Sequence, residues 1–362
     1  MKKILNLFFM LAITVLIFSA CDKNDDPIPD PVESDANGLY FFNYGGDAGA
    51  TITRYNPETN VAINGYYEAQ NQTMIGGPVQ YALDFNNKIY LLGNYPDQVI
   101  VLDSMFIQSA SGITEKINSP RFCVGTGHYL YISCLGASPD WNVMPDSYIA
   151  KFNINTNTVE KTYPMPGGPE GLIIANNKLY AALNYRDSIG VIDLNNEATS
   201  YIATPAVSSY FIMDRSENLY VSLVSTSMDP STKTGLGYVN TTTNSLDTIY
   251  NLEGISGGYS AIMAPNFSHS IIYVLASSWG APGNIYKFNT ETKEYSVFIE
   301  NISGVNGMFV DPTSAEGKVY VFGAESYSEP GTVKVYSVVG NYESEFDCGI
   351  SPYWAMWLDY EE

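Results

Sequence analysis

The feature that most constrains the fold is an apolar residue followed by tyrosine, which recurs seven times along the chain. From one tyrosine to the next, the spacings are 50, 41, 49, 40, 53 and 47 residues. Repeats of about 40–50 residues, each with several short strands, are typical of β-propeller blades. The chain is therefore predicted to form an all-β, seven-bladed β-propeller. The seven pairs are Leu39-Tyr40, Ile89-Tyr90, Leu130-Tyr131, Leu179-Tyr180, Leu219-Tyr220, Ile272-Tyr273 and Val319-Tyr320.

The repeat unit is clearest in residues 169–203, where short apolar runs alternate with polar turns. The turns are rich in Asn, Gly, Asp and Pro, which tolerate or preset the backbone angles of turns. This pattern predicts four strands per blade. In this unit the predicted strands span residues 169–175, 179–183, 188–194 and 198–203.

The two ends of the repeat region predict how the ring closes. Residues 39–43 match the second strand of a unit, and residues 352–358 match a first strand. We therefore expect the C-terminal strand to pair with the N-terminal blade, which leaves no open sheet edge between the two. An open array of seven units or a large sandwich is the alternative.

The first 20 residues have the pattern of a secretory leader. Lys2 and Lys3 precede an apolar run that is short for a membrane span. The segment from Phe18 to Cys21 resembles a bacterial lipobox, although Phe18 stands where leucine is usual. This resemblance implies a signal peptide over residues 1–20 and a lipid on Cys21. An ordinary secretory signal followed by a chance cysteine is the alternative.

Residues 22–38 are predicted to be a disordered tether. They contain three prolines and six acidic residues with few apolar ones, so little surface is available to offset the entropy of ordering. Fully extended, the tether would reach about 55 Å. The acids next to Cys21 resemble the surface-export signal of Bacteroidota lipoproteins, which implies an outer-membrane protein exposed on the cell surface. The predicted organisation is leader 1–20, lipidated cysteine and tether 21–38, and propeller 39–362.

The whole chain has a net charge of −21, and loss of Lys2 and Lys3 with the leader would make it −23. A field of this sign repels nucleic acid, so no nucleic-acid partner is expected. Membrane contact is expected through the lipid anchor only.

Three cysteines follow Cys21, and an odd number is a poor disulfide framework. Comparison with the hairpin at 169–183 places Cys123 opposite Ile132, with Cys134 as a diagonal neighbour. A bridge between Cys123 and Cys134 is left open, but we expect Cys123, Cys134 and Cys348 to be free and buried.

In such a ring, the second-to-third and fourth-to-first loops of all blades share one face, which we call the loop face. The first-to-second and third-to-fourth turns share the opposite connector face. The predicted loop face is richer in aromatic residues, although tyrosine is common throughout the chain and shaping of the loops is the alternative explanation. The candidate ligand-binding aromatics in its loops are Tyr44, Tyr95, Trp141, Tyr185, Trp279 and Tyr327.

Alignment of the predicted innermost strands on Pro or Gly places a ring of polar side chains at the channel mouth of the loop face. Each member can make a side-chain hydrogen bond. Flat apolar surfaces combined with a few polar groups are suited to a small-molecule site. The seven members are Gln80, Arg121, Glu170, Tyr210, Tyr259, Asn306 and Tyr353.

Catalytic patterns are weak in this sequence, and we expect a binding protein and no enzyme. His128 and His269 fall in predicted turns of the connector face, and no phosphate loop, zinc spacing or serine elbow occurs. No cofactor or metal is expected, although bound calcium is left open. The one acid set worth testing for glycoside hydrolysis is Glu170 with Asp47, Asp97 or Asp187.

The repeat resembles the YVTN-type, surface-layer-like seven-bladed propellers over about residues 39–360. The matching segments are 190–193, 99–103 and 289–292, whereas 335–337 lacks the usual aspartate. With its lipobox and acidic tether, the chain also resembles the cobalamin-capturing surface lipoproteins of gut Bacteroidota (BtuG-type). This resemblance implies binding of a corrinoid, vitamin B12, and its delivery to an outer-membrane TonB-dependent transporter. A surface scaffold for a protein or glycan, or a propeller hydrolase or lyase, is the alternative.

Overall fold

The computed structural model describes residues 37–359, except residues 47–48, 138, 227–229, 232, 256–262, 278–281 and 327. The predicted leader, Cys21 and the tether up to residue 36 lie outside the described residues. Within the described part of the chain, no helix has the length and apolar character needed to cross a membrane.

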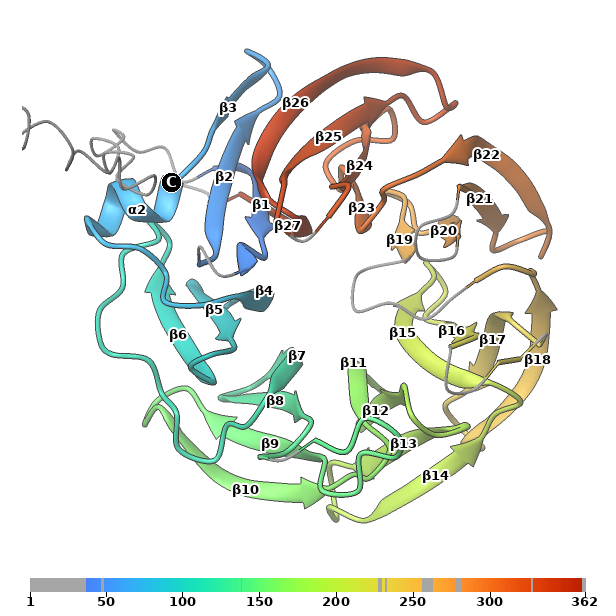
Figure 1. Ribbon diagram of the computed structural model, residues 1–362. Helices are drawn as coiled ribbons and strands as arrows, with labels where there is room; N and C mark the ends of the chain where they lie inside the picture. Colours follow the sequence, from blue (N-terminus) through green and yellow to red (C-terminus); the bar gives the residue numbers. More distant parts are fainter. Residues whose placement is uncertain are drawn as a thin grey trace, which may run out of the picture.

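Seven sheets surround a central axis, as predicted (Figure 1). We number the blades 1 to 7 along the chain, and each runs from an inner first strand to an outer last strand. The sheets, in ring order, are β27 (Pro352–Leu358)–β1 (Gly38–Asn43)–β2 (Thr51–Asn56)–β3 (Val61–Ile63), β4 (Val79–Phe85)–β5 (Lys88–Gly93)–β6 (Gln98–Asp103), β7 (Pro120–Thr126)–β8 (Tyr129–Cys134)–β9 (Tyr148–Asn153)–β10 (Thr158–Pro164), β11 (Pro169–Ala175)–β12 (Lys178–Leu183)–β13 (Ser188–Asp193)–β14 (Thr199–Ala203), β15 (Val207–Met213)–β16 (Leu219–Val224)–β17 (Gly235–Asn240)–β18 (Ser245–Asn251), β19 (Met263–Pro265)–β20 (Ile271–Ala276)–β21 (Gly283–Asn289)–β22 (Tyr295–Ile302) and β23 (Gly307–Val310)–β24 (Val319–Gly323)–β25 (Pro330–Tyr336)–β26 (Tyr342–Ile350).

The recurring apolar-Tyr pair lies in the second strand of each blade, where the side chains fill the space between neighbouring sheets. In blade 4, Tyr180 is fully buried and pairs with Val191 of β13. Its hydroxyl donates to Asn244 Oδ1 of blade 5 at 3.0 Å. The hydroxyl of Tyr220 accepts a hydrogen bond from Lys293 Nζ of blade 6. The repeat therefore supplies both apolar packing and ties between blades.

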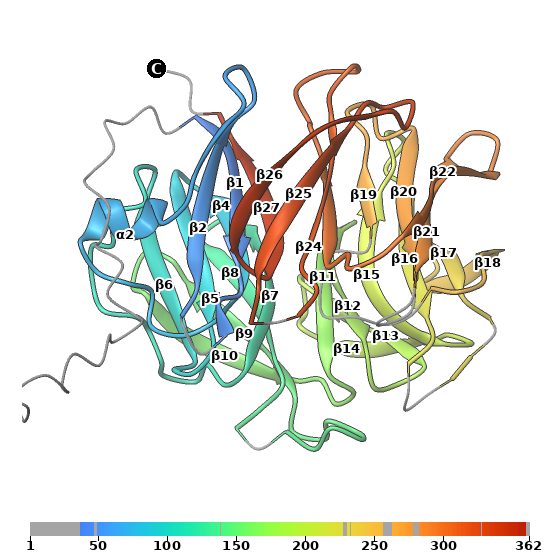
Figure 2. The same cartoon turned by 45° about the horizontal axis from the view of Figure 1, so that its top comes forward.

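The ring closes as predicted, because β27 pairs antiparallel with β1. Leu39 lies opposite Trp357, and Phe41 lies opposite Ala355. The two ends of the repeat region thus form one four-stranded sheet, and blade 1 has an innermost strand like the other blades. The two faces are separated in Figure 2, where the long β8–β9 loop extends from one face and the β2–β3 turn from the other.

Two local features differ from the predicted pattern. Blade 2 has three strands, and the segment after β6 makes only the isolated bridges Val99–Ile113 and Leu102–Gln108. The prediction of an all-β chain is confirmed except for one short helix, α2 (Tyr66–Asn71). A helix of six residues is too short to show a helical period in the sequence.

The cysteine prediction is confirmed, because Cys123, Cys134 and Cys348 are free and buried. Cys123 lies opposite Ile132, as expected from the hairpin comparison. Burial raises the pKa of Cys134 and of Cys348 to about 12, so both thiols stay protonated near neutral pH.

Glu68 of α2 is predicted to make stability depend on pH. Its side chain is 4% exposed, and neither carboxyl oxygen has a hydrogen-bond partner among the described residues. Burial raises its pKa from 4.5 to about 7. Because the pKa is higher in the folded state, the protonated carboxyl of Glu68 favours folding. Its contribution to the free energy of unfolding is complete below about pH 4.5 and is lost as the pH rises through about 7.

We expect the free energy of unfolding of the parent protein, relative to that of Glu68→Gln, to fall by up to about 3 kcal/mol between pH 4.5 and 7.5. Urea denaturation of both proteins across this range measures the difference. Parallel pH profiles for the two proteins would contradict the assignment to Glu68.

Candidate functional site

The centre of the loop face holds a buried polar network of three predicted ring residues. Arg121 Nε donates to both carboxylate oxygens of Glu170 at 3.1 Å, and Arg121 Nη2 donates to Glu170 Oε1 at 2.9 Å. Arg121 Nη1 also donates to Gln80 Oε1. The three side chains come from β4, β7 and β11, the inner strands of consecutive blades. Their meeting confirms the alignment of the inner strands on Pro and Gly.

A β-bulge at the same place in several inner strands explains why these side chains converge. The register of each inner strand against its second strand shifts next to Gln80, Arg121, Glu170 and Tyr210. A shift of the same kind accompanies Tyr353 in β27. A bulge redirects a side chain out of the regular alternation of a strand. In these five blades it directs one polar residue of the inner strand toward the mouth of the channel.

The network is electrostatically coupled to two tyrosines of the ring. Burial by itself lowers the pKa of Arg121, but the charge of Glu170, with Tyr353 and Tyr210 nearby, raises it above its ordinary value. Burial also raises the pKa of Tyr210 well above its usual range, and Tyr353 and Glu170 reinforce this. The guanidinium therefore stays charged and the phenol stays protonated across the physiological pH range.

An aromatic layer lies directly beside this network, and the sequence analysis missed it. The rings of Tyr81 and Phe122 are 3.9 Å apart, and Trp354 lies 4.6 Å from Tyr81. Tyr210 lies 6.0 Å from Phe122. Tyr81, Phe122 and Trp354 each follow a ring residue in the chain, so an aromatic at the next position of the inner strand was the available signal.

The remaining ring residues have different positions. Asn306 Nδ2 donates to Ser351 Oγ at 3.1 Å and to the carbonyl oxygen of Pro352 at 3.2 Å, so it ties blade 7 to the closing strand. Tyr353 lies 6.3 Å from Tyr44, ring to ring, which links the mouth to a loop aromatic. Tyr259 lies outside the described residues.

The Asn-Tyr pairs of two loops divide into a buried asparagine and a more exposed tyrosine. Asn94 and Asn184 are 5% and 7% exposed, and their backbone N–H groups donate to Pro78 and Gly168. Tyr95, by contrast, is 80% exposed, and Tyr185 is half-buried. The asparagines therefore shape the loops, and Tyr95 remains exposed for contact.

Gly168 shows how Tyr185 is positioned. Its φ is +65°, and a Cβ added there would lie 2.5 Å from Cδ2 of Tyr185. The tyrosine ring can therefore lie over the fourth-to-first loop only because this position is glycine. Trp141 is 51% exposed, and its ring lies 6.5 Å from that of Tyr185. Trp279 and Tyr327, the other predicted loop aromatics, lie outside the described residues.

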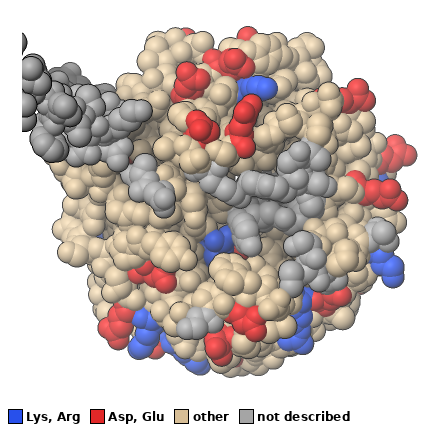
Figure 3. All heavy atoms as spheres, in the orientation of Figure 1, with Lys and Arg blue, Asp and Glu red and all other residues tan. Residues whose placement is uncertain are grey.

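Figure 3 views this face along the axis of the ring. A basic group lies near its hollowed middle, and acidic and basic groups are interspersed around its periphery. Exposed aromatics also occur elsewhere on the molecule, since Phe267 lies on the connector face and Tyr201 and Tyr342 lie on outer strands. The loop face also holds the buried polar network at its centre.

Glu170 and Asp97, two of the four acids considered for hydrolysis, have structural partners. Glu170 is held by Arg121, and Asp97 Oδ2 accepts a hydrogen bond from the backbone N–H of Ser119 at 2.8 Å. Asp187 is exposed and Asp47 lies outside the described residues. Among the described residues, no group of three or more His, Cys, Asp or Glu side chains is arranged to hold a metal ion.

The two histidines lie in turns of the connector face, as predicted. His128 accepts a backbone hydrogen bond from Ile154 through its carbonyl oxygen. The ring of His269 bonds the carbonyl of Met213 at 2.8 Å. Neither contact involves the network at the channel mouth.

The family model described as a domain of unknown function, DUF5074, matches residues 37–340. No curated protein matches the chain. A quinonprotein alcohol dehydrogenase-like protein from Bacteroides thetaiotaomicron has a similar structure, with a TM-score of 0.64 and 17% identity over 89% of this chain and 78% of that one.

Two further solved structures are similar to this chain. Dihydro-heme d1 dehydrogenase NirN, in complex with DHE, gives a TM-score of 0.58 and 10% identity over 91% of this chain and 77% of that one. Virginiamycin B lyase from Staphylococcus aureus gives a TM-score of 0.54 and 11% identity over 80% of this chain and 92% of that one. Identities this low show a shared fold alone.

Proposed function

We propose that this chain, which belongs to the DUF5074 family, is a cell-surface lipoprotein that captures a corrinoid on its loop face. In this proposal Cys21 carries the lipid, residues 22–38 are the tether, and the bound corrinoid passes to an outer-membrane TonB-dependent transporter. The observation that carries the proposal is the set of available aromatic side chains around a polar centre on one face. The protein acts by binding, without turnover.

The aromatic side chains suit the flat macrocycle of a corrinoid. Tyr95 and Trp141 are exposed, and Tyr44 and Tyr185 are half-buried. Each ring that stacks on the ligand contributes about 0.5–1.5 kcal/mol beyond the area it buries. Several such contacts with hydrogen bonds approach the −12 kcal/mol or so that nanomolar binding requires.

The polar centre suits the amide groups at the edge of a corrin ring, which both donate and accept hydrogen bonds. Gln80, Arg121 and Glu170 are held by one another, and each is 7% exposed or less. A preorganised network of this kind loses little entropy on binding. In the proposed complex it forms the floor of the site, whereas the loop aromatics form the rim.

Isothermal titration of the protein without its leader with cyanocobalamin tests the proposal. We expect one corrinoid per chain and co-elution of the two on a sizing column. Absence of both heat and co-elution at micromolar protein would overturn the assignment to corrinoids.

A scaffold for a protein or glycan partner is the second candidate function. The favouring observation is that the ring residues at the mouth bond one another, which gives a filled centre without requiring a ligand. Binding of a surface protein or oligosaccharide, together with no response to cyanocobalamin, would favour this candidate.

A further inference from the structure

The tyrosine ties that join blade 4 to blade 5 and blade 5 to blade 6 have no counterpart among the described residues where the last blade meets the first. Asn60 ends the β2–β3 turn with a φ of +55°, as Asn244 ends the β17–β18 turn with a φ of +54°. Asn244 accepts from Tyr180 of the preceding blade. Asn60 instead accepts from Tyr55 of its own blade at 2.7 Å. The hydroxyl of Tyr320, the recurring tyrosine of blade 7, donates to no described residue.

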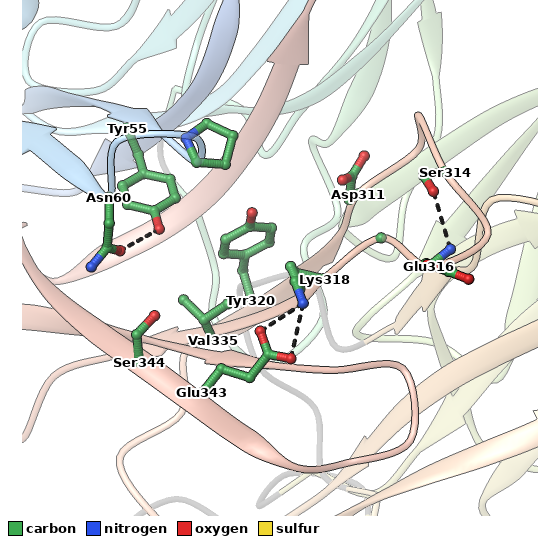
Figure 4. A pocket seen from close by; sticks show the side chains of 12 residues that line it. Tyr55, Asn60, Asp311, Ser314, Glu316, Lys318, Tyr320, Val335, Glu343 and Ser344 are labelled. Carbon is green, nitrogen blue, oxygen red and sulfur yellow. Dashed lines mark hydrogen bonds and ion pairs between the residues drawn. The ribbon is translucent and has the colours of Figure 1, made fainter.

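A cleft of about 400 Å³ opens at this junction on the connector face. Its walls are the β2–β3 turn, the β23–β24 loop and the start of β26. Tyr320 is 1% exposed, so nearly all of its side chain is packed in the core. Figure 4 shows its hydroxyl directed into the cleft, with Asn60 on one side and Asp311 on the other.

The cleft carries excess negative charge. Of its described lining residues, three are acidic and one is basic. The basic one, Lys318, pairs with Glu343 at 2.7 Å. Glu316 and Asp311 therefore have no cationic partner among the described lining residues of the cleft. Asp311 Oδ1 accepts from the backbone N–H and the hydroxyl of Thr313, whereas Oδ2 accepts from no described residue.

The hydroxyl of Tyr320 experiences this charge directly. Burial raises its pKa, and Tyr55 and the carboxylates of Asp311 and Glu343 raise it further. The phenol therefore stays protonated, and its oxygen can accept a hydrogen bond in a region of negative potential. The rings of Tyr55 and Tyr320, with centroids 6.0 Å apart, border the cleft and are 3% and 1% exposed. Aromatic rings and carboxylates together attract organic cations.

We propose that this cleft is a second binding site, which takes a small primary amine. The ammonium group donates to Asp311 Oδ2 and to the oxygen of Tyr320, and the carbon chain of the amine lies along the wall of the cleft. A carboxylate ligand is disfavoured by repulsion from the acids, and a neutral polyol leaves the charge of Asp311 without a counter-ion. The site lies on the face opposite the loop face and does not depend on corrinoid binding.

Ligand-observed NMR with putrescine tests the proposal on the protein without its leader, with butanediol and succinate as neutral and anionic analogues. We expect saturable binding of putrescine and much weaker signals from both analogues. Asp311→Asn should weaken the affinity about tenfold or more, because it removes a charged hydrogen-bond acceptor. Tyr320→Phe removes one hydroxyl that has no partner in the described protein, so it should fold normally and still weaken binding several-fold.

Tyr180→Phe is the matched control, because it removes the same hydroxyl from blade 4, outside the cleft. It should leave putrescine affinity unchanged. Three outcomes would overturn the proposal: no putrescine signal up to about 10 mM, equal signals from butanediol, or equal affinity in the parent, Asp311→Asn and Tyr320→Phe proteins.

Discussion

Replacing Arg121 with methionine is expected to lower the free energy of unfolding by about 3–5 kcal/mol, because it leaves the charge of Glu170 buried without its partner. Both side chains are almost fully buried, with exposures of 7% and 1%. They are joined by three hydrogen bonds from the guanidinium to the carboxylate. Chemical denaturation of the parent and variant proteins measures the difference.

The double replacement of Arg121 and Glu170 by methionine is the matched control. Two apolar side chains of similar volume remove both charges together, and we expect most of the lost stability to return. Lys161→Met breaks the Lys161–Glu197 pair at the surface, where the two side chains are 48% and 34% exposed. It should change the free energy of unfolding far less than Arg121→Met does. If the double variant is as unstable as Arg121→Met, the lost stability does not come from the unpaired charge of Glu170.

Alanine at Tyr95, Trp141 and Tyr185 together is expected to weaken cyanocobalamin binding by about 3 kcal/mol or more, over a hundredfold in Kd. The physical reason is the loss of the aromatic rim of the proposed site. Because Tyr95 and Trp141 are exposed, folding stability should change little. Isothermal titration gives the affinity, and denaturation checks the fold.

The control for the aromatic rim is alanine at Phe267, Val339 and Tyr342, which are exposed on connector turns or at the outer edge of the ring. These three replacements remove similar apolar surface away from the loop face. Cyanocobalamin affinity should remain that of the parent. If the two triple variants lose affinity equally, the loop face is the wrong site.

Much of the polar centre could be predicted because it depends on a short repeated pattern. In five blades a bulge lies next to a polar residue of the inner strand, so residues about one repeat apart meet at the axis. This placed Gln80, Arg121 and Glu170 together correctly. The alignment failed to show that Asn306 turns toward Ser351, because that contact depends on how the closing strand is seated.

The sequence by itself determined the number of blades and the closure of the ring by residues 352–358. These follow from hydrophobic alternation that recurs every 40–53 residues and is typical of a closed propeller. Only the tertiary structure decided how individual hydroxyls and amides are paired. Asn60 bonds Tyr55 rather than Tyr320, and a cleft lies between Asn60 and Tyr320. Such pairings depend on distances of a few tenths of an ångström between blades, which a repeat pattern does not encode.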